Sequence, residues 1–175
     1  IFIDSILDHG KLVYNSDDSQ LSRLVKSNKN SIEFIPYSTP NYRIIDGISF
    51  IDFQDNLYRL KIFGKHNLQN IAGALHVCNL MGIKSEDFYT SLTSFNGASN
   101  RLELIHRTSD FVIYKDFAHS PSKVQATTNA VREQFNNKKL IACFELHTYS
   151  SLNPKFLKKY RDTLDSADEC IICYS

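Results

Sequence analysis

The sequence predicts an α/β protein made of two parts, residues 1–99 and 100–175. Short strand patterns and then two helical patterns fill the first part, with turns that favour antiparallel strands. In the second part strands and helices alternate, which is typical of a doubly wound, mainly parallel sheet. The segment between them, 96–100, is small and polar, as domain boundaries often are. We therefore assign the two parts to separate domains.

Each element of the first part follows from local spacing. Leu21, Leu24 and Val25 recur at helical spacing, and Ser16 or Asp17 is the expected N-cap of that helix. In chain order we expect strands at 1–3 and 11–14, a helix over 17–26, a strand at 32–35, antiparallel strands within 44–62, a helix over 67–81 ended by Gly82, and a helix from Ser85 with Phe88, Leu92 and Phe95 at helical spacing.

The second part begins with a hairpin and then alternates helix and strand. Ser120 is the expected N-cap of the first helix, with Pro121 at the position where a missing N–H costs nothing. The apolar run 140–144 is typical of a strand buried on both faces. In chain order we expect strands at 102–105 and 111–114, a helix from 121, a strand at 140–144, a helix over 154–165 and a strand at 170–174. This is about half of a typical doubly wound sheet, so we expect a part of a longer protein.

Composition argues against several classes of function. The chain has 175 residues, 42% of them apolar, which is enough for a core, and its net charge of +1 argues against a nucleic-acid-binding surface. No apolar run reaches the roughly 20 residues of a membrane helix. No secretory signal opens the sequence, so we expect a cytoplasmic location.

The four cysteines are Cys78, Cys143, Cys170 and Cys173, and most lie in apolar stretches. The last two have the spacing of a metal or redox pair, but residues three apart on a strand point to opposite faces. No second pair completes a zinc site, so no metal ligand is assigned here. We expect buried thiols in a reducing cytosol.

Three side chains at the start of the 67–81 helix could hold a nucleotide base. His66, Asn67 and Asn70 follow one another within two turns, and the two asparagines share a helix face. Amides donate and accept together, which suits the edge of adenine. The alternative is ordinary helix capping, which asparagine also favours.

A second group of candidates surrounds the next strand-to-helix junction. Asp116 follows a strand at the carboxyl end, where ligands gather in open α/β sheets, and could accept ribose hydroxyls. His119 precedes a helix start that favours phosphate. Arg101, just after the linker, could hold phosphate oxygens. The alternatives are a turn-forming aspartate, a structural histidine and a solvated arginine.

A third group follows the 140–144 strand. His147, Thr148 and Tyr149 would line the same crevice as His119, unless they form an ordinary polar loop. A basic face on the 154–165 helix is expected to be solvated surface; its members are Lys155, Lys158, Lys159 and Arg161.

Four motifs follow one another along the chain: G-x-x-V-x-N-x-D-D at Gly10–Asp18, G-x-H-N-x-x-N at Gly64, His66, Asn67 and Asn70, F-x-G-x-x-x-R at Phe95, Gly97 and Arg101, and D-[YF]-[AG]-H-x-P at Asp116–Pro121. They resemble those of the Mur ligase family, the ATP-dependent amide ligases that build peptidoglycan precursors, and the resemblance spans nearly the whole chain. Two positions depart from the family: Lys115 replaces a usual first Asp and Ser120 a frequent second His, which affects fine positioning in the cleft.

The resemblance implies roles for the candidate residues. Residues 1–99 would be the C-terminal part of the central ATP-binding domain, and 100–175 the first half of the Rossmann-like C-terminal domain. His66, Asn67 and Asn70 would contact adenine. Arg101 would reach the ATP phosphates and act in catalysis with His119, and Asp116 would hold the ribose. His119 and His147 would face the closed cleft between the domains, together with Thr148 and Tyr149 from the same loop as His147.

The resemblance also implies substrates. The residues at 101–103, 116–119 and 140–145 are most similar to those of the peptidoglycan-recycling branch of the family. That branch joins UDP-N-acetylmuramate through an acyl phosphate to the tripeptide L-alanyl-γ-D-glutamyl-meso-diaminopimelate. The branch that adds L-alanine is the alternative. Folylpolyglutamate synthases, with the same fold, are less favoured by the wording of 116–121.

A phosphate-binding loop, G-x-x-x-x-G-K-[ST], is absent from the chain. The family's phosphate loop, magnesium ligands and UDP-sugar domain all precede the region that this chain resembles. We therefore expect ATP and Mg²⁺ to be used by a complete ligase, with the magnesium ligands outside this chain, and expect the chain alone to be inactive. A stand-alone module that binds nucleotide without catalysis is the other alternative.

Overall fold

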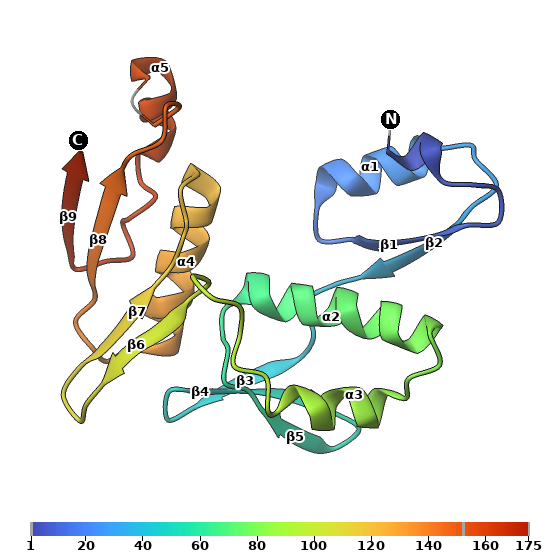
Figure 1. The fold of residues 1–175 in the computed structure, drawn as a ribbon, viewed down its shortest axis with the longest axis horizontal. Helices are drawn as coiled ribbons and strands as arrows, with labels where there is room; N and C mark the ends of the chain where they lie inside the picture. Colours follow the sequence, from blue (N-terminus) through green and yellow to red (C-terminus); the bar gives the residue numbers. More distant parts are fainter. Residues whose placement is uncertain (1, 152, 175) are drawn as a thin grey trace. The chain divides into compact units, whose positions relative to one another are not determined.

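The computed structural model describes residues 2–151 and 153–174, which form two compact units (Figure 1). Residues far apart in sequence contribute to each unit, because strands near the middle of the chain divide between them. Unit 1 contains 1–43, 50–59 and 65–94; unit 2 contains 44–49, 60–64 and 95–175.

Unit 1 begins with a β-α-β arrangement. Strands β1 (Lys11–Asn15) and β2 (Glu33–Tyr37) pair in parallel and are joined through helix α1 (Ser19–Ser27), which confirms the predicted order. The N-cap is Asp18, whose Oδ1 accepts the amides of Gln20 at 2.8 Å and Leu21 at 3.1 Å. The prediction of Ser16 or Asp17 was wrong because both side chains bond to more distant segments.

The predicted strand at 1–3 was wrong as far as the structure describes it. Residues Ile3–Ser5 form a short 3₁₀ helix, η1, and Ile1 lies outside the described residues. Both the amide and the hydroxyl of Ser5 donate to the Phe2 carbonyl, at 3.1 and 2.7 Å. This local bonding closes a turn and leaves the segment no ladder partner.

A three-stranded sheet follows, with the predicted antiparallel pairing. Its order is β3-β4-β5, and Gln54 and Asp55, with φ of 49° and 62°, form the tight turn between the last two strands. Strands β4 and β5 pair in antiparallel, and the bounds are β3 (Tyr42–Ile45), β4 (Ile48–Phe53) and β5 (Asn56–Arg59).

Two helices complete unit 1: α2 (Lys65–Leu80) and α3 (Ser85–Leu92). Gly82 follows α2 with φ of +87°, as predicted for a helix end. The aromatic anchor of α3 is Tyr89, which is 3% exposed and has ring centroids of Phe53 and Tyr58 at 4.8 and 5.2 Å. The predicted stripe missed this residue.

Unit 2 combines a hairpin with a parallel strand pair. Its core cluster contains Phe63, Leu102 and Ala130, packed against Tyr114 and neighbouring residues of the next helix. The elements are β6 (Glu103–Arg107) antiparallel to β7 (Val112–Lys115), α4 (Pro121–Gln134), β8 (Ile141–Leu146), α5 (Pro154–Leu157), a 3₁₀ turn η2 (Lys158–Tyr160), and β9 (Glu169–Tyr174) parallel to β8. This mixture of antiparallel and parallel pairs confirms the predicted α/β class.

Two details of unit 2 differ from prediction. Helical structure from Pro154 ends at Tyr160 rather than 165, and Asp162 has a left-handed φ of 64° that no helix continues. Strand β8 is not buried on both faces: exposed residues alternate with half-buried ones, and every residue of β9 is exposed. The described residues half-bury one face of β8 and leave β9 exposed, so Cys143, Cys170 and Cys173 are exposed rather than buried as predicted. Cys78 on α2 is half-buried.

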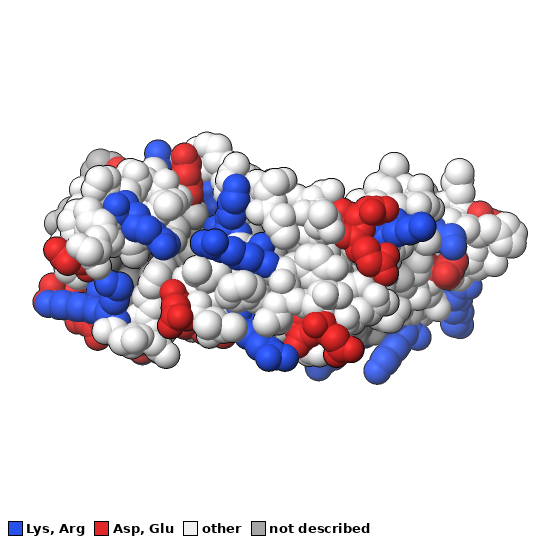
Figure 2. Space-filling view, turned by 90° about the horizontal axis from the view of Figure 1, so that it is seen from below, with Lys and Arg blue, Asp and Glu red and all other residues white. Residues whose placement is uncertain are grey.

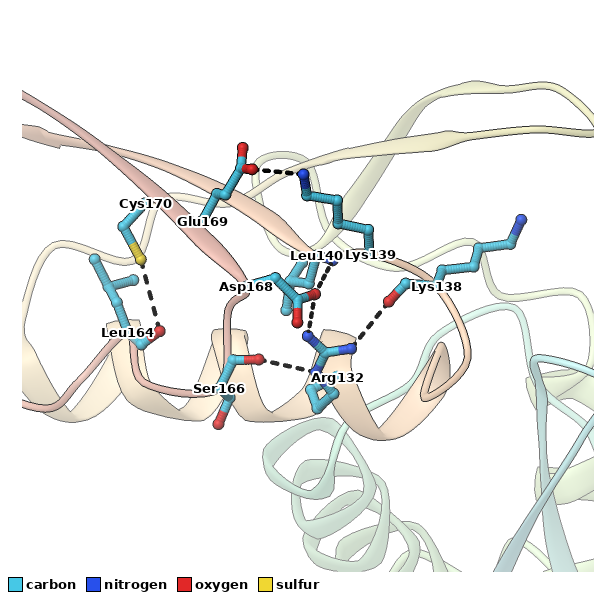
Figure 3. A network of polar contacts seen from close by, with 9 residues as sticks. All are labelled: Arg132, Lys138, Lys139, Leu140, Leu164, Ser166, Asp168, Glu169 and Cys170. Atoms are coloured by element: carbon cyan, nitrogen blue, oxygen red, sulfur yellow. Dashed lines mark hydrogen bonds and ion pairs between the residues drawn. The ribbon is translucent and has the colours of Figure 1, made fainter.

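Arg132 links helix α4 to the segments that lead into the parallel strands β8 and β9 (Figure 3). Its Nη1 donates to the Lys138 carbonyl at 2.9 Å, its Nε to the Ser166 carbonyl at 2.9 Å, and its Nη2 to Asp168 Oδ2 at 2.5 Å. The same Asp168 oxygen accepts the Leu140 amide at 2.7 Å. One guanidinium thus fixes the end of α4 against the starts of β8 and β9.

The surface carries both signs of charge. On the face in Figure 2, basic and acidic side chains are scattered among other residues. Over 2–151 and 153–174, no helix has the length and apolar character needed to cross a membrane.

Candidate functional site

The predicted base-binding residues lie in the first two turns of α2. His66 and Asn67 are half-buried and Asn70 is exposed. Leu68 and Ile71, at 0% and 4% exposure, bury the opposite side of the same turns. The structure therefore brings the three predicted polar side chains together on an anchored helix start.

Asp116 follows β7 directly and braces its own surroundings. Its Oδ1 accepts the amides of Phe117 at 3.0 Å and Leu102 at 3.3 Å, and its Oδ2 accepts the Thr127 hydroxyl from α4. A carboxylate offers about four lone-pair positions, so three are used and about one is left for another donor. Thr127 lies eleven residues away, which is why sequence spacing did not identify this partner.

The segment that precedes β6 has an unusual backbone. Gly97, Asn100 and Leu102 have φ of 91°, 55° and 46°, and Leu102 is only 8% exposed. A left-handed φ costs a bulky residue about 1–3 kcal/mol, so packing and hydrogen bonds must hold this conformation. Glu103 Oε2 accepts the Asn100 amide at 2.8 Å, and the Phe117 amide donates to the Asn100 carbonyl at 3.0 Å.

Arg101 lies between these two left-handed residues and is exposed. Its amide donates to the Ala98 carbonyl at 3.1 Å. Its guanidinium has no polar partner within the part of the chain that the structure describes. The strained backbone therefore presents a cation at the start of β6, where an anion could bind it.

His119 lies at the start of α4, with Ser120 as the N-cap residue and Pro121 at the first helical position, as predicted. The Ser120 side chain makes no capping hydrogen bond. His119 Nδ1 lies 2.9 Å from the Phe117 carbonyl, an acceptor only, so Nδ1 carries a proton and Nε2 is the atom left for a ligand. The Tyr160 hydroxyl donates to the His119 carbonyl at 2.5 Å, which fixes the backbone here.

Phe117 brings the two predicted histidines together. Its ring is 51% exposed, with the His119 ring centroid at 5.0 Å and the His147 ring centroid at 6.2 Å. His147 Nδ1 lies 3.3 Å from the Glu145 carbonyl, so its Nε2 is also the outward nitrogen. The ends of β7 and β8 therefore meet at one aromatic cluster. Sequence reasoning did not select Phe117, although an aromatic between Asp116 and His119 was the available signal.

Thr148 and Tyr149 are placed differently from the histidines. The Thr148 hydroxyl accepts the Ser151 amide at 3.2 Å, and the Ser151 hydroxyl donates back to the Thr148 carbonyl at 2.7 Å. Thr148 thus closes a tight turn around a serine that is 2% exposed. The Tyr149 ring is 94% exposed and has no ring contact among residues 2–151 and 153–174.

A separate groove of about 500 Å³ lies at the other end of β7 and α4. None of the predicted site residues lines it; its walls include Asp46, Arg107, Phe111, Gln134 and Lys138. Among the described residues, no group of three or more His, Cys, Asp or Glu side chains could hold a metal ion.

Known proteins resemble the chain over nearly its whole length. A UDP-N-acetylmuramate–L-alanine ligase from Caldicellulosiruptor bescii is 30% identical over 98% of this chain and 40% of the relative. One from Flavobacterium psychrophilum is 31% identical over 98% of this chain and 38% of the relative. The chain thus spans about two fifths of these relatives, or less of others, such as 25% of a Desulfitobacterium hafniense ligase. No protein-family model matches.

Solved structures share the fold. A UDP-N-acetylmuramate–alanine ligase from Thermotoga maritima has a TM-score of 0.69 at 17% identity, covering 93% of this chain and 37% of that chain. A complex of FPGS with AMPPCP and folate has a TM-score of 0.67 at 13% identity, covering 94% and 42%. The fold alone therefore does not distinguish ligase branches. The recycling branch predicted from the motif residues is not confirmed, because the relatives from Caldicellulosiruptor bescii and Flavobacterium psychrophilum are named as L-alanine-adding ligases, the alternative branch.

Proposed function

We propose that this chain, a relative of the Mur ligases, is the end of the ATP-binding domain and the beginning of the C-terminal domain of an ATP-dependent amide ligase. The observation that carries the proposal is the 30% identity, over 98% of the chain, to a protein named UDP-N-acetylmuramate–L-alanine ligase. The ordered motifs and the geometry around Asp116 support it.

The proposed role of α2 is to contact adenine. His66, Asn67 and Asn70 occupy its first two turns, where amide groups can pair with both donors and acceptors of the base. These contacts would read the base edge and would not depend on the phosphates.

The proposed role of the β7–α4 junction is to hold the ribose and orient the reacting groups. Asp116 has room for about one further donor, so we propose one ribose hydroxyl as its ligand while the other oxygen positions brace Leu102 and Thr127. Arg101 would bind phosphate oxygens and stabilise the charge that develops there. His119, with Nε2 outward, would face the reacting groups, and His147 would face the acceptor.

The proposed reaction joins the carboxylate of UDP-N-acetylmuramate to an amine through an acyl phosphate, in the cytoplasm, for peptidoglycan synthesis or recycling. The relatives favour L-alanine as the amine. The tripeptide of the recycling branch stays the second candidate. Mg²⁺ would be held by residues outside this chain.

The test is an ATP-dependent ligation assay of the complete ligase that contains this chain, with UDP-N-acetylmuramate and either L-alanine or the tripeptide. Product with L-alanine would support the branch of the relatives, and product with the tripeptide the recycling branch. A protein that binds ATP but forms neither product would contradict the ligase proposal and support a binding module.

A further inference from the structure

Asp17 joins three segments of unit 1 that are far apart in sequence. Its Oδ2 accepts the Thr39 amide at 3.1 Å, the Thr39 hydroxyl at 2.8 Å and the Gln69 side-chain amide at 3.1 Å. The Gln69 amide also lies 3.0 Å from the Thr39 hydroxyl oxygen. The three side chains therefore form a closed hydrogen-bonded triad, which we call the Asp17 triad.

The turn after β1 explains why Asp17 is available for this bonding. Asn15 Oδ1 accepts the Asp17 amide at 3.0 Å, and the Ser16 amide and hydroxyl both donate to the Tyr37 carbonyl, at 2.7 and 2.8 Å. Asp18 caps α1. The residues of the Asn-x-Asp-Asp motif thus make different hydrogen bonds: Asn15 closes the turn, Asp18 caps α1, and Asp17 accepts a hydrogen bond from Gln69 on α2.

Gln69 is one of several anchors along α2. Gly73 packs so close to Tyr37 that an added Cβ would lie 3.0 Å from the ring, and the His76 ring centroid lies 6.5 Å from that of Tyr37. Positions 69, 73 and 76 recur at helical spacing, so they form one anchored stripe. Gln69 is the member nearest the N-terminus and stands between Asn67 and Asn70 in sequence.

We propose that Asp17 and Gln69 are positioning residues for nucleotide binding: the Asp17 triad fixes the first two turns of α2, which carry His66, Asn67 and Asn70. This inference rests on the proposed function. Neither Asp17 nor Gln69 needs to touch the nucleotide. Both act by holding the helix that does, since a displacement of about 1 Å weakens directed hydrogen bonds substantially.

The charge of Asp17 supports this arrangement. The side-chain hydrogen bond from Thr39, then its backbone amide and Gln69, hold the pKa of Asp17 below its ordinary 3.8, with a further contribution from Lys65. The carboxylate therefore stays ionised at neutral pH and accepts charge-assisted hydrogen bonds, which are stronger than neutral ones.

The experiment is an NMR titration of the 175-residue chain with ATP, alongside thermal unfolding of each variant. Gln69→Leu removes the donors and keeps the size of the side chain. Gln69→Glu places a second carboxylate against Asp17. In the double variant Asp17→Asn/Gln69→Glu the donor and acceptor are exchanged, so that the amide at position 17 can donate to the carboxylate at position 69. Gln20→Leu, an exposed amide on α1, is the matched control.

We expect the Kd for ATP to rise at least about fivefold in Gln69→Leu and more in Gln69→Glu, with recovery to within about twofold in the double variant and no change in Gln20→Leu. All titrations are made well below each unfolding temperature. A purely structural triad would lower that temperature and leave Kd unchanged.

Three outcomes decide the matter. The expected pattern supports positioning. If the wild-type chain binds ATP, and Gln69→Leu and Gln69→Glu bind it with the same Kd as the wild type, the positioning role is overturned and the proposed function stands. Absence of ATP binding by the wild-type chain overturns both, and the wild-type titration alone identifies that case.

Discussion

Asp17 in unit 1 and Asp116 in unit 2 are two carboxylates that come shortly after a strand, β1 in the parallel pair and β7 in the antiparallel hairpin, and they differ in the segments that they join. Asp17 accepts three hydrogen bonds on one oxygen, from Thr39 and Gln69. Asp116 divides three over two oxygens, and one of its donors, Leu102, directly follows the exposed Arg101 in sequence. The comparison shows that carboxylates after two strands make different contacts: Asp17 links a loop to α2, whereas Asp116 links the segment before β6 to α4 and has the proposed ribose-binding role.

The largest expected effect is on nucleotide affinity at Asp116. Asp116→Ala in the 175-residue chain should raise the Kd for ATP about 10- to 100-fold, because a charge-assisted hydrogen bond is worth about 1.5–3 kcal/mol. NMR titration measures it, with the exposed Asp165→Ala as control.

Thr127→Val separates the two tasks of Asp116. It removes only the brace from α4, so the unfolding temperature should fall while the Kd for ATP changes by less than about threefold. If Thr127→Val weakens ATP as much as Asp116→Ala does, the carboxylate is a brace alone and the contrast with Asp17 fails.

Arg101 should affect turnover more than binding. In the complete ligase, Arg101→Ala should lower the turnover number by about tenfold or more with a nearly unchanged Kd for ATP, if its contact strengthens in the transition state. Arg101→Lys should restore part of the rate, since an ammonium lacks the planar fork. Wild-type turnover in Arg101→Ala would mean that the exposed guanidinium is only solvated surface.

The Arg132 network in Figure 3 is expected to serve stability alone. Arg132→Met should lower the unfolding temperature by about 5–10 °C, because it leaves the Lys138 and Ser166 carbonyls and Asp168 without their donor. The exposed Arg161→Met is the control. A loss of ATP affinity in Arg132→Met at temperatures well below unfolding would show that the crossover also positions the site.

Acid should weaken both units through carboxylates with lowered pKa. The Leu140 amide, and then Arg132, hold the pKa of Asp168 below its ordinary 3.8, and Thr39 does so first for Asp17. Each stabilising contribution is therefore complete above pH 3.8 and is lost as pH falls through the lower folded-state pKa.

Thermal unfolding between pH 5 and pH 2.5 measures this loss. The wild-type unfolding temperature should fall more steeply than that of Asp168→Asn, which lacks one of the two titrating groups. Parallel curves for the two proteins would show that Asp168 does not contribute to acid sensitivity.

The smallest expected signal is catalysis by the chain alone. Without a phosphate-binding loop, the 175 residues should hydrolyse ATP no faster than a buffer blank, as measured by phosphate release. Turnover that Asp116→Ala abolishes would contradict this expectation.

Periodicity and turn chemistry predicted most of the fold, because strands such as 11–14 and helix starts such as Pro121 are fixed by local spacing. Local spacing could not reveal the exposed faces of β8 and β9, since burial depends on which elements cover a sheet. It also missed the Asp17 triad, whose partners lie 22 and 52 residues away. Around the candidate site, motif order selected Asp116 and His119, whereas Phe117 and Thr127 required the structure.

The most direct test of the account is an amide-resolved NMR titration of the wild-type chain with ATP. We expect the largest shifts at residues 66–70 of α2 and at Arg101 and 116–119 of unit 2, with binding in about the millimolar range because the phosphate loop is absent. Shifts confined to the groove near Arg107 and Lys138, or no shifts at millimolar ATP, would contradict the assignment of this chain as the nucleotide-holding part of a ligase.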